Sequence, residues 1–382
     1  MTHDPGRWRP LFPILGTSTY LISNSLGAMP RATRDKLDEY ADAWATRGVR
    51  AWEEGWWDLP LTVGDLVAPL IGAPPGTVTM HQNVSLAEAI VLSCFEPSGK
   101  RNKIVCEDGN FPSVMYFYAA QRGLRLVTVP VERLVDAIDA ETLLVPTSHV
   151  LFRNAYIQDI APVIEKAHRV GARVVLDCFH SAGVLPFSVE RLGVDFAVGG
   201  CLKWLCGGPG NGWLYVRKDL LDTLEPAITG WAAHEAPFAF AMPPIRRTSG
   251  ARRFLQGTPH VPCLYAAMEG LRIIREVGVE GIRAHSMKLT AILLECTLEM
   301  GLESPTPRDP ARRGGTVTVN PPDAQAIAMA LLERNYLIDY RPDAGIRIAP
   351  HFYTTEEECD AVMSEIAALA KRRPALRLTQ SR

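Results

Sequence analysis

The sequence has almost no net charge and no long apolar run. Its 40 lysines and arginines are balanced by 42 aspartates and glutamates, so the formal net charge is −2. This balance excludes the strongly basic surface that nucleic acids and anionic membranes attract. No apolar stretch reaches the roughly 18 residues of a membrane-spanning helix, and the first seven residues lack the pattern of a signal peptide. We expect no nucleic-acid partner, no membrane partner and a cytoplasmic location.

The cysteines do not form the pattern of a metal site or a disulfide framework. There are eight, and only Cys201 and Cys206 lie close together in the sequence. A structural zinc site would need a second closely spaced pair of ligands, and none accompanies them. Free cysteines in apolar surroundings act as small hydrophobic residues. We therefore predict reduced thiols and no metal site.

The order of apolar runs predicts an α/β protein. At 382 residues the chain exceeds one ordinary core, which suggests two domains. Between about residues 61 and 225, short apolar runs alternate with helical patterns, which indicates a mainly parallel sheet flanked by helices. The expected buried strands lie at 103–106, 126–130, 142–146 and 174–177.

From about residue 261 the pattern changes. Long amphipathic helices come first, and two strand-like segments and a last helix follow. This order predicts a smaller C-terminal α+β domain. We place the large domain at 61–260 and the small one at 261–382, and we expect the N-terminal segment, 1–60, to pack with the small domain.

Three residues of the large domain suggest a covalent cofactor. Asp177 ends an apolar strand, His180 follows three residues later, and Lys203 stands in an apolar run before a glycine-rich turn. Burial lowers the proton affinity of a lysine, and its neutral amine forms a Schiff base with an aldehyde. A buried aspartate keeps a pyridinium nitrogen protonated. The pattern indicates pyridoxal phosphate; a snorkelling surface lysine and a helix-capping aspartate are the alternatives.

A second pattern predicts where a phosphate binds. Residues 77–90 read as a strand, a polar turn and a helix that starts near Val84. Free backbone N–H groups at the start of a helix bind phosphate, and Ser85 adds a hydroxyl. The alternative is that Asn83 only caps the helix, and at this point both interpretations stay open.

These motifs resemble the class V aminotransferase group of fold-type-I pyridoxal-phosphate enzymes, and within it the kynureninase branch. The similar segments run from about residue 20 to residue 355; they lie at 23–27, 57–65, 109–113, 148–150, 177–180, 203, 230–240, 253–259, 308–314 and 345–347. The resemblance implies PLP fold type I, an amino-acid substrate and a homodimer.

The resemblance also implies roles around the cofactor ring. Lys203 falls on the Schiff-base lysine, and Asp177 falls on the partner of the pyridine nitrogen. His180 is the neighbour of that aspartate and a catalytic candidate that can move protons. Phe111 falls on the residue that stacks on the ring.

Further implied roles concern the phosphate and the substrate. Trp231 and Thr258 help Val84 and Ser85 to hold the phosphate, Thr258 from the partner subunit of the dimer. Arg347 falls on the arginine that grips the substrate carboxylate, and bidentate pairing suits a guanidinium to that task.

The sequence departs from the kynureninase pattern at four positions. Leu202 stands where kynureninases carry a tyrosine that serves the phosphate and proton transfer, and leucine has no polar group for either task. Val114 replaces an aspartate, and Asn154 and Ala155 replace a Thr-Gly pair. Because the missing groups belong to the proton-handling set, the departures argue against kynurenine hydrolysis and leave cofactor binding intact.

The resulting hypothesis is a kynureninase-like lyase or hydrolase that has diverged toward an S-substituted cysteine or related substrate in small-molecule biosynthesis. A thiolate is a good leaving group, so its elimination depends least on the missing groups. The alternatives on the same scaffold are a decarboxylating oxidative deaminase, an aminotransferase and kynureninase itself. A non-catalytic binding protein is a further alternative, which predicts loss of Lys203 or Asp177, and both are present.

Overall fold

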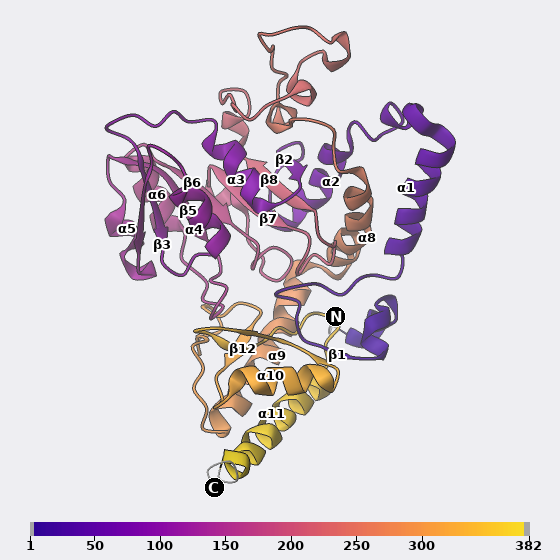
Figure 1. Ribbon diagram of the computed structural model, residues 1–382, viewed down its shortest axis with the longest axis vertical. Helices are drawn as coiled ribbons and strands as arrows, with labels where there is room; N and C mark the ends of the chain where they lie inside the picture. Colours follow the sequence, from indigo (N-terminus) through magenta and orange to yellow (C-terminus); the bar gives the residue numbers. More distant parts are fainter. Residues whose placement is uncertain (1–3, 378–382) are drawn as a thin grey trace.

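The computed structural model describes residues 4–377, and its larger part is built around a seven-stranded sheet (Figure 1). The strands are β2 (Val78–His81), β3 (Lys103–Glu107), β4 (Arg125–Val129), β5 (Thr142–Ser148), β6 (Arg173–Asp177), β7 (Phe196–Gly200) and β8 (Gly212–Val216). Their order is β2-β8-β7-β6-β5-β3-β4. Neighbouring strands run parallel except at β8, which is antiparallel to both β2 and β7. The predicted mainly parallel sheet is confirmed.

Both faces of this sheet are buried, which explains the uninterrupted apolar runs. In β6, Val174 and Leu176 belong to one hydrophobic cluster and Val175 to another, because successive side chains of a strand point to opposite faces. Helices supply the rest of both clusters. The first face is covered by α2 (Leu59–Val67), α6 (Ala161–Arg169), the short α7 (Val189–Leu192) and α8 (Val261–Val277), and the second by α3 (Val84–Leu92) and α4 (Pro112–Ala119). The short α5 (Leu134–Ala137) packs against α6 and β3.

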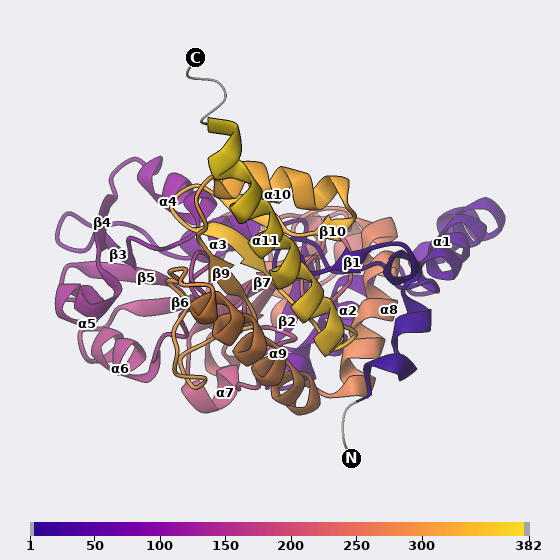
Figure 2. The same cartoon turned by 90° about the horizontal axis from the view of Figure 1, so that it is seen from below.

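The C-terminal part has its own sheet and core. The antiparallel sheet β11-β12-β9 consists of β11 (Asp339–Arg341), β12 (Gly345–Ile348) and β9 (Val317–Val319). The helices α9 (Val279–Glu299), α10 (Ala324–Glu333) and α11 (Glu356–Arg377) accompany it, and α11 packs along the other two (Figure 2). A third hydrophobic cluster, which includes Leu293, Ile346 and Val362, lies between them.

The N-terminal segment touches both parts. The strand β1 (Thr19–Tyr20) pairs with β10 (Tyr336–Leu337) beside the small sheet, whereas α1 (Thr33–Arg47) packs against α8 at the edge of the molecule (Figure 1). The division of the chain at residues 60 and 260 stays a prediction, as does the cytoplasmic location. Within residues 4–377, no helix has the length and apolar character required to cross a bilayer.

Candidate active site

Three neighbouring strands bring the predicted residues together at their carboxyl ends. Ser148 and Asp177 are the last residues of β5 and β6 and are register partners. The His149 N–H donates to the Asp177 carbonyl oxygen over 2.9 Å, which holds the two strand ends together. The next strand, β7, ends at Gly200, three residues before Lys203. In an open parallel sheet, ligands bind beyond the carboxyl ends of the strands.

The amine of Lys203 lies between a histidine and two aromatic rings. Its Nζ is 2.8 Å from Nε2 of His180, 4.3 Å from the ring centroid of Phe179 and 5.7 Å from that of Phe111. Burial lowers the pKa of Lys203 to about 7, although the Asp177 carboxylate raises it. Burial and the charge of Lys203 also hold the pKa of His180 well below its usual range. A neutral imidazole therefore faces an amine that is easily deprotonated.

Asp177 is buried, with 9% of its surface exposed. Its Oδ1 accepts a hydrogen bond of 2.8 Å from the Phe179 N–H. Burial raises the pKa of Asp177, whereas this hydrogen bond and the charge of Lys203 oppose the rise. A cationic group beside the carboxylate would favour its charged form further.

These residues line one cavity of about 210 Å³. Asp177, His180, Lys203 and Phe111 line it together with the predicted phosphate residues Val84 and Ser85. The remaining wall is largely apolar and includes Leu202, Val114 and Phe152. The structure thus brings six of the predicted site residues together.

At the start of α3, Asn83 caps the helix and free N–H groups remain as well. Oδ1 of Asn83 accepts a hydrogen bond of 2.9 Å from the Leu86 N–H, so Asn83 is the N-cap. In the part of the chain that the structure describes, no acceptor bonds to the N–H groups of Val84 and Ser85. Two residues that line the cavity therefore keep free backbone donors at the start of α3, where the helix dipole favours an anion.

Arg347 lies behind the cavity wall. Its side chain is buried and forms two hydrogen bonds with the carboxylate of Asp339, and its Nη1 donates to the Phe152 carbonyl oxygen over 2.8 Å. Arg347 does not line the cavity, but Phe152 does. The arginine contacts the site through the backbone of that residue.

Trp231 and Thr258 lie outside this cavity. Trp231 is 39% exposed and packs in an aromatic cluster with Trp57, Phe238 and Phe240. Thr258 lines a separate hollow of about 310 Å³. Within a single chain, neither residue is brought to the cavity that contains Lys203.

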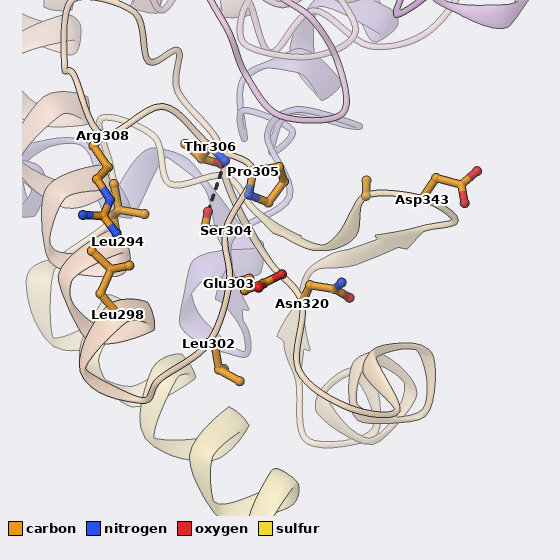
Figure 3. A pocket seen from close by; sticks show the side chains of 11 residues that line it. Leu294, Leu298, Leu302, Glu303, Ser304, Pro305, Thr306, Arg308, Asn320 and Asp343 are labelled. Carbon is orange, nitrogen blue, oxygen red and sulfur yellow. Dashed lines mark hydrogen bonds between the residues drawn. The ribbon is translucent and has the colours of Figure 1, made fainter.

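A larger hollow of about 440 Å³ lies in the C-terminal part (Figure 3). It is lined by Leu294, Leu298 and the loop that carries Ser304 and Thr306, whose hydroxyl and N–H are joined by a hydrogen bond of 3.2 Å. None of the predicted site residues lines it. Volume alone therefore does not identify the site, whereas the convergence of Lys203 with the buried strand ends does.

Sequence reasoning missed three residues around this site. Phe179 stands between two predicted residues, and its ring lies closer to the Lys203 amine than that of Phe111 does. Phe152 follows the 148–150 motif at a distance of two residues, so both were within reach of the pattern. Asp339 had no local signal, because its significance depends on a partner in another strand.

The comparison with protein families identifies the chain. The family model described as aminotransferase class V matches residues 19–362. The chain belongs to the class V aminotransferase family. Relatives of this class V chain include an uncharacterized aminotransferase, YcbU of Bacillus subtilis (strain 168), which is 33% identical over 96% of this chain and 99% of its own length. A kynureninase of Pseudomonas fluorescens is 33% identical over 90% of this chain and 87% of its own length.

Solved structures share the fold of this class V chain. A cysteine desulfurase from Thermococcus onnurineus NA1 has a TM-score of 0.84 with 22% identity, and covers 97% of this chain and 100% of its own. The protein C-DES, in a variant with glycine covalently linked to its PLP cofactor, has a TM-score of 0.85 with 23% identity, and covers 94% of this chain and 98% of its own. The expected PLP fold type I is confirmed.

Class V aminotransferases are enzymes that use pyridoxal phosphate, and the cavity fits that group. An amine with a lowered pKa and a buried carboxylate line the same cavity. Val84 and Ser85, whose N–H groups are free at the start of α3, also line it, and such groups bind an anionic phosphate. The chain therefore has backbone donors for the phosphate, an amine for the aldehyde and a carboxylate for the pyridine nitrogen.

Proposed function

We propose that this class V enzyme is a kynureninase-like lyase that acts on an S-substituted cysteine or a related amino acid in small-molecule biosynthesis. The observation that carries the proposal is the Lys203 amine, held by His180 beside Asp177, in a cavity whose adjoining wall is apolar at Leu202 and Val114. Lys203, His180 and Asp177 support the cofactor chemistry, and Leu202 and Val114 support the choice of substrate.

The residues that would hold the cofactor follow from their chemistry. Pyridoxal phosphate, when bound, supplies an aldehyde that captures amines and a ring that withdraws electrons from the attached amino acid. Lys203 is the amine that would hold the aldehyde, and Asp177 would pair with the pyridine nitrogen. Phe111 would cover the ring, and the N–H groups of Val84 and Ser85 would bind the phosphate.

Catalysis then depends on proton transfer by this chain's own side chains. With the cofactor and substrate bound, Lys203 would be the base that removes the proton from the substrate Cα. The neutral His180 ring holds the lysine amine in place and accepts or returns its proton. Arg347 would bind the substrate carboxylate and so fix the orientation of Cα.

The apolar wall favours a leaving group that needs no acid. Leu202 and Val114 have no proton to donate, and a thiolate leaves without protonation. The overall reaction converts the S-substituted cysteine and one water into a thiol, pyruvate and ammonia. The bond between sulfur and Cβ breaks, and the electron pair leaves with the sulfur.

Product analysis tests this function. Purified holoenzyme is incubated separately with kynurenine and with a cysteine S-conjugate such as S-benzylcysteine. We expect pyruvate and thiol from the conjugate, and none from the Lys203→Ala variant. Release of anthranilate from kynurenine would indicate kynureninase instead, and release of an aldehyde with CO₂ would indicate decarboxylating deamination. Borohydride treatment that tags a residue other than Lys203 would reject the proposed chemistry altogether.

We further propose that two copies of the chain complete the phosphate site. A phosphate carries close to two negative charges, whereas Lys203 is the one cationic side chain among the described residues that line the cavity. Trp231 and Thr258, which the family resemblance assigns to the phosphate, lie elsewhere in the same chain. The proposal is a homodimer in which Thr258 of one copy reaches the phosphate bound by the other.

Mixing two inactive variants tests this arrangement. If Thr258 acts across the dimer, a heterodimer of Lys203→Ala and Thr258→Ala chains contains one intact site. Random exchange would then restore about a quarter of the sites. The assay uses a cofactor concentration that saturates the wild type but not Thr258→Ala. No restoration, although mixed dimers form, would mean that Thr258 acts within its own chain.

A further inference from the structure

Arg347 is held by a residue on the adjacent strand. Asp339 in β11 and Arg347 in β12 are register partners in the antiparallel pair. Nε of Arg347 donates to Oδ1 of Asp339 over 2.8 Å, and Nη2 donates to Oδ2 over 2.5 Å. Both side chains are buried, with 3% and 8% of the residue surface exposed. A bidentate pair of this kind fixes the plane of the guanidinium.

The hydrogen bonds leave a defined part of the guanidinium free. A guanidinium has five N–H groups, and Arg347 uses one on Nε, one on Nη2 and one on Nη1, the last to the Phe152 carbonyl oxygen. One N–H therefore remains on each terminal nitrogen, without an acceptor among residues 4–377. These two N–H groups lie in the plane of the guanidinium on neighbouring nitrogens, and we call them the free fork; donors of this kind suit a carboxylate.

The guanidinium of Arg347 lies next to the cavity wall. Phe152, whose carbonyl oxygen accepts from Nη1, is part of the cavity wall. The charge of Arg347 lowers the pKa of both Lys203 and His180, so the guanidinium lies near the reacting groups. Asp339 also forms an ion pair of 3.0 Å with Arg341. Two arginines and one aspartate leave one positive charge, which one substrate carboxylate neutralises.

We propose that Asp339 is a positioning residue that aims the free fork of Arg347 at the α-carboxylate of the amino-acid substrate. This inference rests on the proposed function, because it concerns the carboxylate end of the same site. Asp339 itself would not contact the substrate. The role is to prevent the long side chain of Arg347 from adopting other orientations.

A comparison of two ligands isolates this role. L-Alanine and L-alaninamide differ at the carboxylate and share the same amine and side chain, and both are titrated into the holoenzyme while the cofactor absorbance is followed. In Asp339→Asn we expect binding of L-alanine to weaken by roughly ten- to a hundredfold, because a misplacement of about 1 Å has such effects. Binding of L-alaninamide should stay unchanged, so the preference for the carboxylate shrinks. Equal weakening for both ligands, or no change for either, would refute the positioning role.

A matched control and a milder variant complete the experiment. Asp219 pairs with Arg217 through the same two atoms, Nε to Oδ1 and Nη2 to Oδ2, but far from the cavity and at an exposed surface. Asp219→Asn should leave both titrations unchanged. If Asp339→Asn does not fold, Asp339→Glu keeps the charge and displaces it by one methylene, and an intermediate loss confined to L-alanine is expected. A wild-type holoenzyme that responds to neither ligand would reject the proposed function itself, which is a different outcome.

Discussion

Replacing Gly27 by alanine should displace the loop that carries Lys203, the proposed cofactor lysine. The Gly27 N–H donates to the Leu202 carbonyl oxygen over 2.8 Å, so the N-terminal loop lies directly on this segment. A Cβ atom at Gly27 would stand 2.1 Å from the Lys203 carbonyl oxygen and 2.9 Å from Cα of Cys206. Both are backbone atoms, which cannot rotate away as a side chain does.

The size of the effect follows from this geometry. Restoring an ordinary contact of 3.4 Å from 2.1 Å requires a shift of about 1.3 Å between the two segments. A displacement of about 1 Å in a positioned group costs up to roughly a hundredfold in rate, and overpacking destabilises a core by about 1–3 kcal/mol. We therefore expect Gly27→Ala to lower the rate of cofactor capture by Lys203 and to lower the melting temperature.

The assay is the absorbance of the lysine-bound cofactor after addition of pyridoxal phosphate to the apoprotein, together with thermal unfolding. Gly16→Ala is the matched control, because a Cβ at Gly16 meets no atom within 4 Å. The control should behave like the wild type. If Gly27→Ala also binds the cofactor at the wild-type rate with an unchanged melting temperature, the close contact between this loop and the Lys203 segment is refuted.

Three further predictions concern protonation, the departure at Leu202 and stability. Cofactor capture should rise with pH through about 7, because burial lowers the pKa of Lys203 to that value and only the neutral amine attacks; Asp177→Asn should move the midpoint lower, and a rate that keeps rising to pH ~10 would indicate an ordinary lysine. Leu202→Tyr adds a hydroxyl at the cavity and should raise cofactor affinity up to about tenfold and increase anthranilate release from kynurenine; unchanged values would show that this position does not limit either. Asp195 is fully buried and contacts two arginines and a histidine, so Asp195→Asn should lower the free energy of unfolding in urea by about 3 kcal/mol without affecting cofactor binding.

Local patterns predicted the elements that bury both faces or have a clear start. The first long helix expected from about residue 261 is α8, which begins at Val261, and α3 begins at Val84 as expected from its sequence. The antiparallel direction of β8 could not be predicted from these patterns, because an antiparallel strand buried on both faces has the same apolar run as a parallel one. Its direction follows from the connection after β7, which has no helix to carry the chain back across the sheet.

The site was predictable where residues share a strand end and unpredictable where they meet across elements. Asp177 and Lys203 were placed correctly in one cavity, because the carboxyl ends of neighbouring strands lie at one edge. Asp339 was missed, since the register that pairs β11 with the next strand, β12, is not visible in a single sequence. Trp231 and Thr258 followed from family resemblance alone, and their roles stay predictions.

The segment that follows β5 explains how the two parts of the molecule share one site. The carbonyl oxygens of Phe152, Arg153 and Ala155 accept hydrogen bonds from Arg347, Thr318 and Gly314, so β12, β9 and the loop before β9 all hold the same stretch of backbone. This stretch supplies the Phe152 wall of the cavity. A movement of the small sheet would therefore carry the wall together with Arg347, because Arg347 belongs to β12 and is bonded to Phe152. If Arg347 binds the substrate carboxylate as proposed, the carboxylate and the Phe152 wall would belong to one unit, whereas Lys203 follows β7 of the large sheet.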